Sequence, residues 1–273
     1  MIEQIQIRKP EPIIAISNIL DADAARLADF AHNFGFAGIE WSIDPHASDI
    51  ELLKQIDLLK DFEVRFHMRW PGIEFAHADN RSEMAMNLYR SKLELLAIMG
   101  GEYNTIHLGL GRVDLKELDW RKAIYNLTEL VYFGNELGIK VCLENIVANW
   151  TGKPELFNQI IRQTGAGVTL DIGHAYVCQT KKPTENVYEQ FTKPNWNNVF
   201  GAHIYHTEIP NVGHISPDNL LQIEKRLALL NSLPHCNWWL IELAKPAEIL
   251  KTSKICQKFL AISAKQTQPV AAN

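Results

Sequence analysis

The feature that most constrains the fold is a pattern that occurs eight times along the chain. Each occurrence opens with a short apolar run rich in β-branched residues and continues with a polar loop and an amphipathic stretch. Nearly continuous apolar runs are typical of parallel strands that are buried on both faces. The eight runs cover residues 13–17, 38–43, 64–68, 105–108, 141–146, 168–172, 199–204 and 238–243.

The stretches between these runs predict helices. Residues 21–35, 81–99 and 119–137 carry apolar side chains at helical spacing and end at or just before a glycine. A further helix is expected to begin at Ser216, with Pro217 at its first helical position.

Eight strand–helix alternations in a chain of 273 residues predict a single (β/α)8 TIM barrel. We assign residues 1–262 to this barrel and residues 263–273, which are polar and rich in small residues, to a disordered C-terminal tail. A doubly wound open sheet is the alternative. No GxGxxG motif follows the first strand, which argues against the dinucleotide-binding form of that fold.

The composition indicates which cellular compartment and which classes of binding partner to expect. The four cysteines are far apart and form no CxxC pair, which favours reduced thiols in a cytoplasmic protein. No run of about 18 apolar residues predicts a membrane span, and the first ten residues lack the apolar core of a signal peptide. The net charge of −5 argues against nucleic acid as a partner. We expect a small-molecule substrate, and assembly into a homo-oligomer stays open.

The apolar runs end in ionisable residues with unusual regularity. These residues are Glu40, His67, His107, Glu144, Asp171, His174, His203 and Glu242. In a TIM barrel the C-terminal ends of the strands carry the chemistry, and a charge among leucine and β-branched residues is costly unless it is paired or metal-bound. Four consecutive strands would supply three carboxylates and one imidazole, an oxygen-rich set that suits Mn²⁺, Mg²⁺ or Co²⁺, with Zn²⁺ or Fe²⁺ also possible.

Several short motifs give the chain a family resemblance. They are Gly-Phe-Ala-Gly-Ile-Glu at 35–40, Leu-Glu-Asn at 143–145, Leu-Asp-Ile-Gly-His at 170–174, His203, and Ile-Glu at 241–242. From about residue 13 to residue 260 the sequence resembles the xylose isomerase-like TIM barrel superfamily, which includes sugar-phosphate isomerases, ketose 3-epimerases and apurinic endonucleases.

The resemblance implies roles for individual residues. The metal ligands of the superfamily match Glu144, Asp171, His203 and Glu242. The histidine of its Asp-x-x-His motif, which faces the substrate, matches His174. In the epimerase branch the two glutamates also move protons, which makes Glu144 and Glu242 the expected catalytic residues.

The endonuclease branch holds three zinc ions and uses histidines on the third and fourth strands, which His67 and His107 match. It also uses an Asp-x-His after the seventh strand, where this chain has Val212, a glycine and His214. Because the aspartate is missing and the net charge is negative, we expect one metal ion. Whether His67, His107 and His214 are additional metal ligands stays open.

The expected substrate contacts include side chains and loop cations at the strand ends. They are His67, His107, His174, Glu40, Arg69 and Lys245, with Arg112 as a further loop cation. The favoured function is a metal-dependent isomerase or epimerase of a small sugar, polyol or keto acid, acting by proton transfer beside a carbonyl. The alternatives are a dehydratase or lyase of a hydroxy-keto acid, an apurinic endonuclease-like hydrolase, and a non-catalytic metabolite-binding barrel.

Overall fold

The computed structural model describes residues 10–110 and 113–266. Eight parallel strands close into a barrel, with the neighbour order β1-β10-β7-β6-β5-β4-β3-β2. The strands are β1 (Ile13–Ser17), β2 (Gly38–Ser42), β3 (Glu63–Met68), β4 (Tyr103–Ile106), β5 (Lys140–Glu144), β6 (Gly167–Asp171), β7 (Val199–Ile204) and β10 (Trp238–Ile241). The closed barrel confirms the predicted fold and rules out the open sheet.

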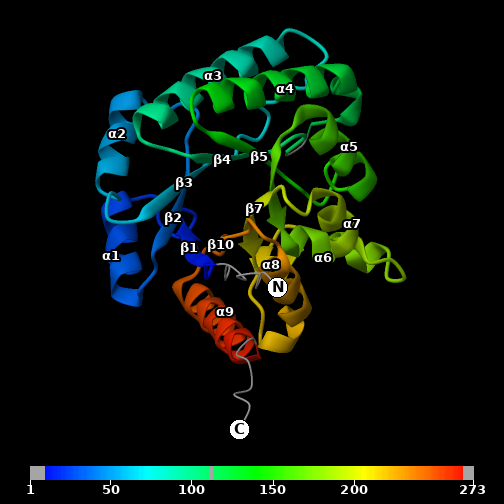
Figure 1. Cartoon of the computed structure of the whole chain (residues 1–273). Coiled ribbons are helices and arrows are strands. Elements are labelled where there is room, and N and C mark those ends of the chain that lie inside the picture. Colours follow the sequence, from blue (N-terminus) through cyan, green and yellow to red (C-terminus); the bar gives the residue numbers. More distant parts are fainter. Residues whose placement is uncertain (1–9, 111–112, 267–273) are drawn as a thin grey trace, which may run out of the picture.

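Helices form the outer layer around this barrel (Figure 1). They are α1 (Ala24–Phe34), α2 (Asp49–Asp57), α3 (Arg81–Ile98), α4 (Trp120–Glu136), α5 (Pro154–Thr164), α6 (Ile172–Lys181), α7 (Val187–Thr192), α8 (Glu224–Ser232) and α9 (Pro246–Gln266). Local capping explains several boundaries. The Asp119 side chain accepts a hydrogen bond from the Lys122 amide, and Gly35 ends α1 in the left-handed region with a φ of 71°. The N-cap of α1 is Asp23, two residues after the N-cap expected at Asp21.

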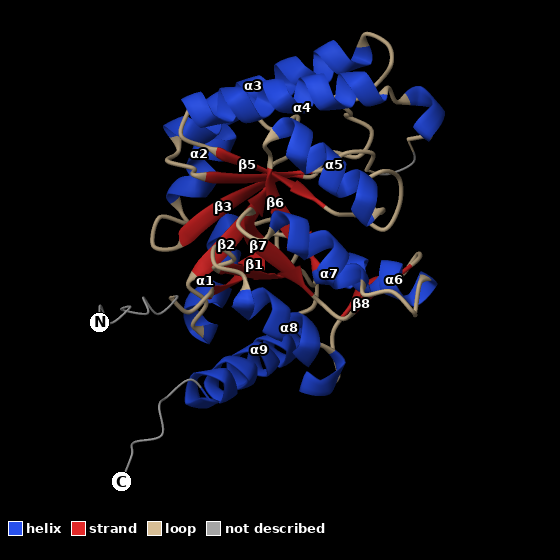
Figure 2. Ribbon diagram, turned by 45° about the vertical axis from the view of Figure 1, so that its right-hand side comes forward, coloured by secondary structure: helices blue, strands red, loops and turns tan. Residues whose placement is uncertain are grey.

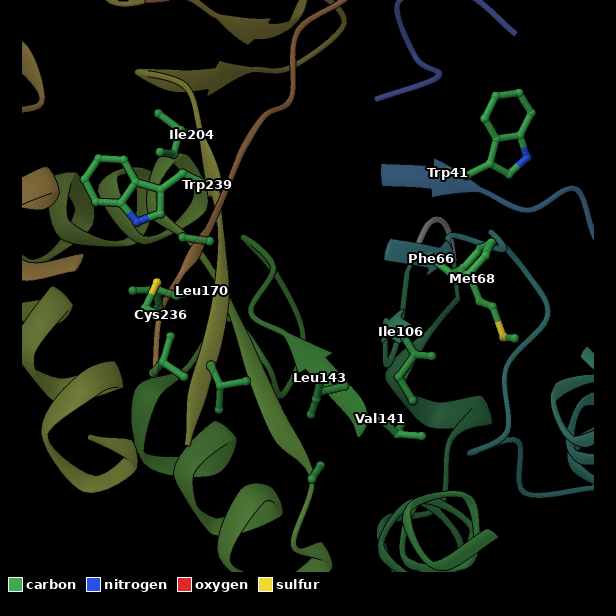
Figure 3. Close-up of a cluster of buried hydrophobic side chains, with 14 of the residues drawn as sticks. Trp41, Phe66, Met68, Ile106, Val141, Leu143, Leu170, Ile204, Cys236 and Trp239 are labelled. Carbon is green, nitrogen blue, oxygen red and sulfur yellow. The ribbon is translucent and has the colours of Figure 1, made fainter. Parts of the chain in front are cut away.

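Successive strand side chains point alternately toward the helices and into the barrel. On β3, Phe66 and Met68 belong to the apolar cluster between strands and helices, whereas Arg65 and His67 contact groups inside the barrel. Figure 3 shows part of that outer cluster, including Leu143 from β5 and Leu170 from β6. The outward positions of each strand are apolar, which explains the apolar runs in the sequence. Polar side chains occupy inward positions near the C-terminal ends of the strands.

The floor of the barrel is filled by large side chains. The Arg65 guanidinium lies 3.9 Å from the Tyr103 ring centroid and 4.7 Å from that of Trp238. Gly38 makes room for this packing, since a Cβ there would lie 2.6 Å from the Trp238 ring. The barrel is thus closed at its N-terminal end, and the polar groups above are supported by a rigid base.

Two short strands form an antiparallel hairpin that the sequence analysis did not predict. β8 (Thr207–Ile209) pairs with β9 (Gly213–Ile215), and the hairpin lies beside α6, as Figure 2 shows. The helix expected at Ser216 was also wrong, because α8 begins at Glu224. The backbone amide of Asp218 donates instead to the Gln222 side chain, 2.6 Å away.

The C-terminal prediction needs a correction as well. Helix α9 runs to Gln266, so the first four residues of the predicted tail are helical, and three of them are the good helix formers Ala264, Lys265 and Gln266. The remainder of that tail, 267–273, lies outside the described residues. All four cysteines are buried and free of disulfides, and no helix in the described ranges is long and apolar enough to cross a membrane.

Candidate metal centre and active site

Four residues meet at the C-terminal mouth of the barrel. Glu144, Asp171 and His203 end or nearly end β5, β6 and β7, and Glu242 directly follows β10. These four strands are neighbours in the barrel. One potential ligand atom from each residue lies within 4.8 Å of the others, and all four side chains are buried. We call these four residues the metal cluster.

The atoms of the metal cluster point toward one another. His203 Nδ1 lies 3.2 Å from Glu242 Oε2, 3.3 Å from Glu144 Oε2 and 4.0 Å from Asp171 Oδ2. Both His203 Nδ1 and Glu144 Oε2 are buried without a hydrogen-bond partner among the described residues. Buried carboxylates in such proximity require a compensating cation. The donor set therefore fits a hard or borderline divalent metal ion.

The charges inside the cluster depend strongly on one another. Burial opposes ionisation of Glu144, but His203 and His107 hold the pKa of its carboxyl well below the usual range. Burial also works against the His203 cation, yet Glu144, Glu40 and Glu242 raise the pKa of His203 well above its ordinary value. Burial raises the pKa of Asp171 to about 6 despite the attraction of His174. Because a metal requires neutral imidazole and ionised carboxylates, its binding should displace protons from this cluster.

A second group of potential ligands adjoins the metal cluster and consists of His67, His107 and Glu144. The Nε2 atoms of His67 and His107 lie 3.4 and 3.1 Å from Glu144 Oε2. Burial lowers the pKa of His107 in spite of the neighbouring Glu144 carboxylate, which favours a neutral ring. The structure thus places both histidines next to the metal cluster.

A third group lies at the rim and contains His174, Glu208 and His214. His174 Nε2 is 3.4 Å from Glu208 Oε2, and Glu208 stands directly opposite His214 in the β8–β9 hairpin. Glu208 is not among the predicted site residues, because the expected motif has its acidic residue at the position of Val212. A detectable signal was the turn sequence Pro-Asn-Val-Gly at 210–213 between residues typical of strands.

Asp171 is held rigidly by its surroundings. Its Oδ1 accepts the backbone N–H of His174 at 2.7 Å and its Oδ2 accepts the Tyr205 hydroxyl at 2.9 Å. The Asn145 side chain bonds both the amide and the carbonyl of Asp171. Gly173 admits the Tyr205 ring, since a Cβ at that position would lie 2.0 Å from it. These contacts fix the carboxylate before any ligand arrives.

The predicted loop cations do not join these groups in the described part of the chain. Arg69 is exposed, and the exposed Lys245 pairs with Glu248 in the first turn of α9 at 3.1 Å. Arg112 lies outside the described residues. A role of Arg69 or Lys245 in holding substrate stays a prediction.

Glu74 is a buried carboxylate that sequence reasoning also missed. It lies in the loop after β3, where it accepts the backbone amides of Ala76 and of Gly109 in the loop after β4. Asn149, from the loop after β5, donates to the Gly109 carbonyl at 2.6 Å. Glu74 therefore joins two mouth loops, and burial raises its pKa to about 7.

This pKa predicts how stability depends on pH. Between pH 4.5 and about 7 the folded state holds the Glu74 proton while the unfolded state has lost it, so the free energy of unfolding should fall as pH rises. The Glu74→Gln variant has no such proton to lose. At 1.36 kcal/mol per pKa unit, its free energy of unfolding relative to that of the wild type should rise by about 3 kcal/mol between pH 4.5 and about 7. Urea titrations at several pH values measure the difference. Parallel stability profiles for the two proteins would contradict the assignment.

Comparisons with known proteins bear on the family and on the fold. A family model described as xylose isomerase-like TIM barrel matches residues 28–249. A protein of Methanocaldococcus jannaschii is 28% identical over 163 residues, which cover 60% of this chain and 69% of that protein. A D-tagatose 3-epimerase-like structure shares 17% identity, with a TM-score of 0.72 over 93% of this chain and 99% of the other.

Two further solved structures have the same fold. An L-ribulose 3-epimerase matches with 15% identity and a TM-score of 0.72, covering 97% of this chain and 99% of the other. The IOLI protein with a bound zinc atom matches with 14% identity and a TM-score of 0.68, covering 94% and 99%.

Proposed function

Because the chain belongs to the xylose isomerase-like TIM barrel family, we propose that it is a metal-dependent isomerase or epimerase of a small sugar, polyol or keto acid. The observation that carries the proposal is the convergence of Glu144, Asp171, His203 and Glu242, one from each of four neighbouring strands. Structures of ketose 3-epimerases and of a zinc-containing barrel with the same fold support it.

When bound in the cluster, the divalent ion would polarise the carbonyl and hydroxyl oxygens of the substrate. The side chains of Glu144 and Glu242 would transfer the protons. Burial opposes their charge, but neighbouring histidines lower the pKa values of Glu144 and Glu242, so both carboxylates are ionised at neutral pH. They stand on the first and last of the four strands. One carboxylate can take the proton from the carbon beside the carbonyl. The other can return a proton to the opposite face of that carbon.

His174, at the rim, is the residue that we propose assists the reaction. Burial works against its charge, but Asp171, Glu208 and Glu144 raise its pKa to about 10. Its Nδ1 lies 2.9 Å from the Asn145 carbonyl and its Nε2 faces the hairpin. A protonated ring held in this way can donate a hydrogen bond to a substrate oxygen.

The His174→Ala variant separates this role from metal ligation. We expect it to keep the bound metal and to lose turnover by about 10²-fold or more, because one charge-assisted hydrogen bond and one acid group are removed. Elemental analysis of the purified variant, beside its steady-state kinetics, makes the distinction. Loss of metal together with activity would instead make His174 a ligand.

The proposal is tested by loading the protein with Mn²⁺ or Co²⁺ and screening ketoses and polyols by thermal shift. A turned-over substrate in heavy water should acquire deuterium at the carbon beside the carbonyl. Complete retention of the substrate hydrogen would contradict proton transfer through the glutamates and indicate a hydride shift. Net loss of water from the substrate would indicate the lyase. A protein that gains no stability from either metal would be the metabolite-binding barrel.

A second candidate is a hydrolase related to the apurinic endonucleases. It is favoured by the two additional groups around the cluster, in particular by Glu208, which supplies a carboxylate beside His174 and His214. The net charge of −5 argues against it. Three zinc ions per chain and cleavage of abasic DNA would establish this reading in place of the first.

A further inference from the structure

Glu40 lies inside the barrel, beneath the histidines of the mouth. It belongs to β2, its side chain is 2% exposed, and its Oε1 lies 3.1 Å from both His67 Nδ1 and His203 Nε2. Its Oε2 accepts a hydrogen bond from Trp238 Nε1 at 3.2 Å. Both oxygens of Glu40 therefore have protein neighbours, and its expected contact with substrate stays a prediction.

We propose that Glu40 is a positioning residue, which selects the ring nitrogens that His67 and His203 present to the metal cluster. The proposal rests on the proposed metal centre and adds a residue outside the ligand set. It assigns to a single carboxylate the orientation of two imidazoles on different strands.

The donors and acceptors around Glu40 decide which ring nitrogens carry hydrogen. An ionised carboxylate offers only lone pairs, so its charge favours the hydrogen on the ring nitrogen that lies 3.1 Å from Glu40 Oε1. A neutral imidazole has one N–H, and its other nitrogen then holds a lone pair. Glu40 therefore leaves lone pairs on His67 Nε2 and on His203 Nδ1. These two atoms lie 3.4 and 3.3 Å from Glu144 Oε2.

Two lone pairs that face a carboxylate repel it unless a cation lies between them. The arrangement is stable when a metal ion occupies this space, and it is the arrangement that a histidine ligand with a carboxylate behind it adopts in metal sites. Trp238 contributes indirectly, because its N–H fixes the second oxygen of Glu40 and its ring forms the barrel floor. Glu40 therefore connects Trp238 in the barrel floor with the His67 and His203 rings at the mouth.

The Glu40→Gln variant should disturb this arrangement with little change in volume. An amide has one acceptor oxygen, whereas Trp238 and two rings each need an acceptor at this site. The amide NH₂ forces any ring nitrogen that it faces to be unprotonated. The N–H of that ring then points toward the metal cluster, and in the case of His203 it blocks ligation. Loss of such a supporting carboxylate typically weakens metal binding about 10- to 100-fold.

The experiment compares Co²⁺ binding to the wild type, Glu40→Gln and the matched control Glu74→Gln. Glu74 is also a buried glutamate at the mouth, and it accepts hydrogen bonds from the backbone amides of Ala76 and Gly109 rather than from imidazoles. We expect 10- to 100-fold weaker Co²⁺ binding and an altered Co²⁺ absorption spectrum for Glu40→Gln alone. Equal affinity for Glu40→Gln and the wild type would overturn the proposal. Failure of the wild type to bind Co²⁺ would overturn the metal centre itself.

A second measurement needs no variant and does not depend on its folding. In the wild type loaded with Zn²⁺, long-range ¹H–¹⁵N spectra report which ring nitrogen carries the hydrogen. We expect hydrogen on Nε2 of His203 and on Nδ1 of His67. A His203 ring with its hydrogen on Nδ1 would contradict the role assigned to Glu40.

Discussion

Replacing Asp171 with alanine is expected to abolish metal binding, with a loss of affinity greater than about 100-fold, because a direct ligand should cost more than a supporting residue. Asp171 is fully buried and its carboxylate is held by Tyr205 and by the His174 amide. The metal content after dialysis against Mn²⁺, measured by elemental analysis, gives the result.

Two controls keep this experiment interpretable. Asp171 is also the N-cap of α6, and loss of a cap costs about 1 kcal/mol of stability. Asp171→Asn retains a capping side chain but removes the charge, so it should fold like the wild type and still bind metal poorly. Asp218→Ala removes an exposed aspartate that pairs with Lys251 and should leave binding unchanged. Stoichiometric metal in Asp171→Ala would remove this residue from the ligand set.

The second large effect concerns proton transfer. Glu144→Gln and Glu242→Gln should each slow turnover by about 10²- to 10⁴-fold, the usual contribution of one general acid or base. An amide keeps the size of the side chain but cannot accept the proton. Because both residues also belong to the metal cluster, kinetics must be measured at saturating metal with bound metal verified.

Deuterium exchange gives this prediction its sharper form. If each glutamate serves one face of the substrate, one variant should lose exchange from one epimer while the other retains it. Variants with full metal occupancy and turnover within about threefold of the wild type would exclude the glutamates as proton carriers, since that falls far below the expected contribution.

Much of the fold could be predicted because its determinants are local. The boundaries of β1 and β7 agree with the predicted runs, since each is a compact apolar segment flanked by polar residues. The hairpin was missed because β8 and β9 have three residues each, too few to establish a period of two. The prediction of a helix from Ser216 was wrong because a capping pattern indicates only where a helix can begin. Packing against the rest of the protein decides where the helix does begin, which here is Glu224.

The site likewise contains residues that the local sequence predicts and residues whose place depends on contacts between distant segments. Strand ends and residue types sufficed to bring Glu144, Asp171, His203 and Glu242 together, because a closed barrel makes the ends of neighbouring strands converge. The contribution of Glu208 depends on a hairpin, and the place of Glu40 depends on which residues face inward. A motif or a turn signal can point to either residue, but their partners follow from contacts between segments far apart in the chain.

The central claim is that Glu144, Asp171, His203 and Glu242 hold one divalent metal ion. The most direct measurement is an anomalous difference map from crystals of the wild type grown with Mn²⁺, together with the metal content of the same protein. We expect one strong peak per chain, within bonding distance of all four residues. Absence of a peak at these residues, or three peaks distributed over His67, His107, His174 and His214 as well, would contradict it.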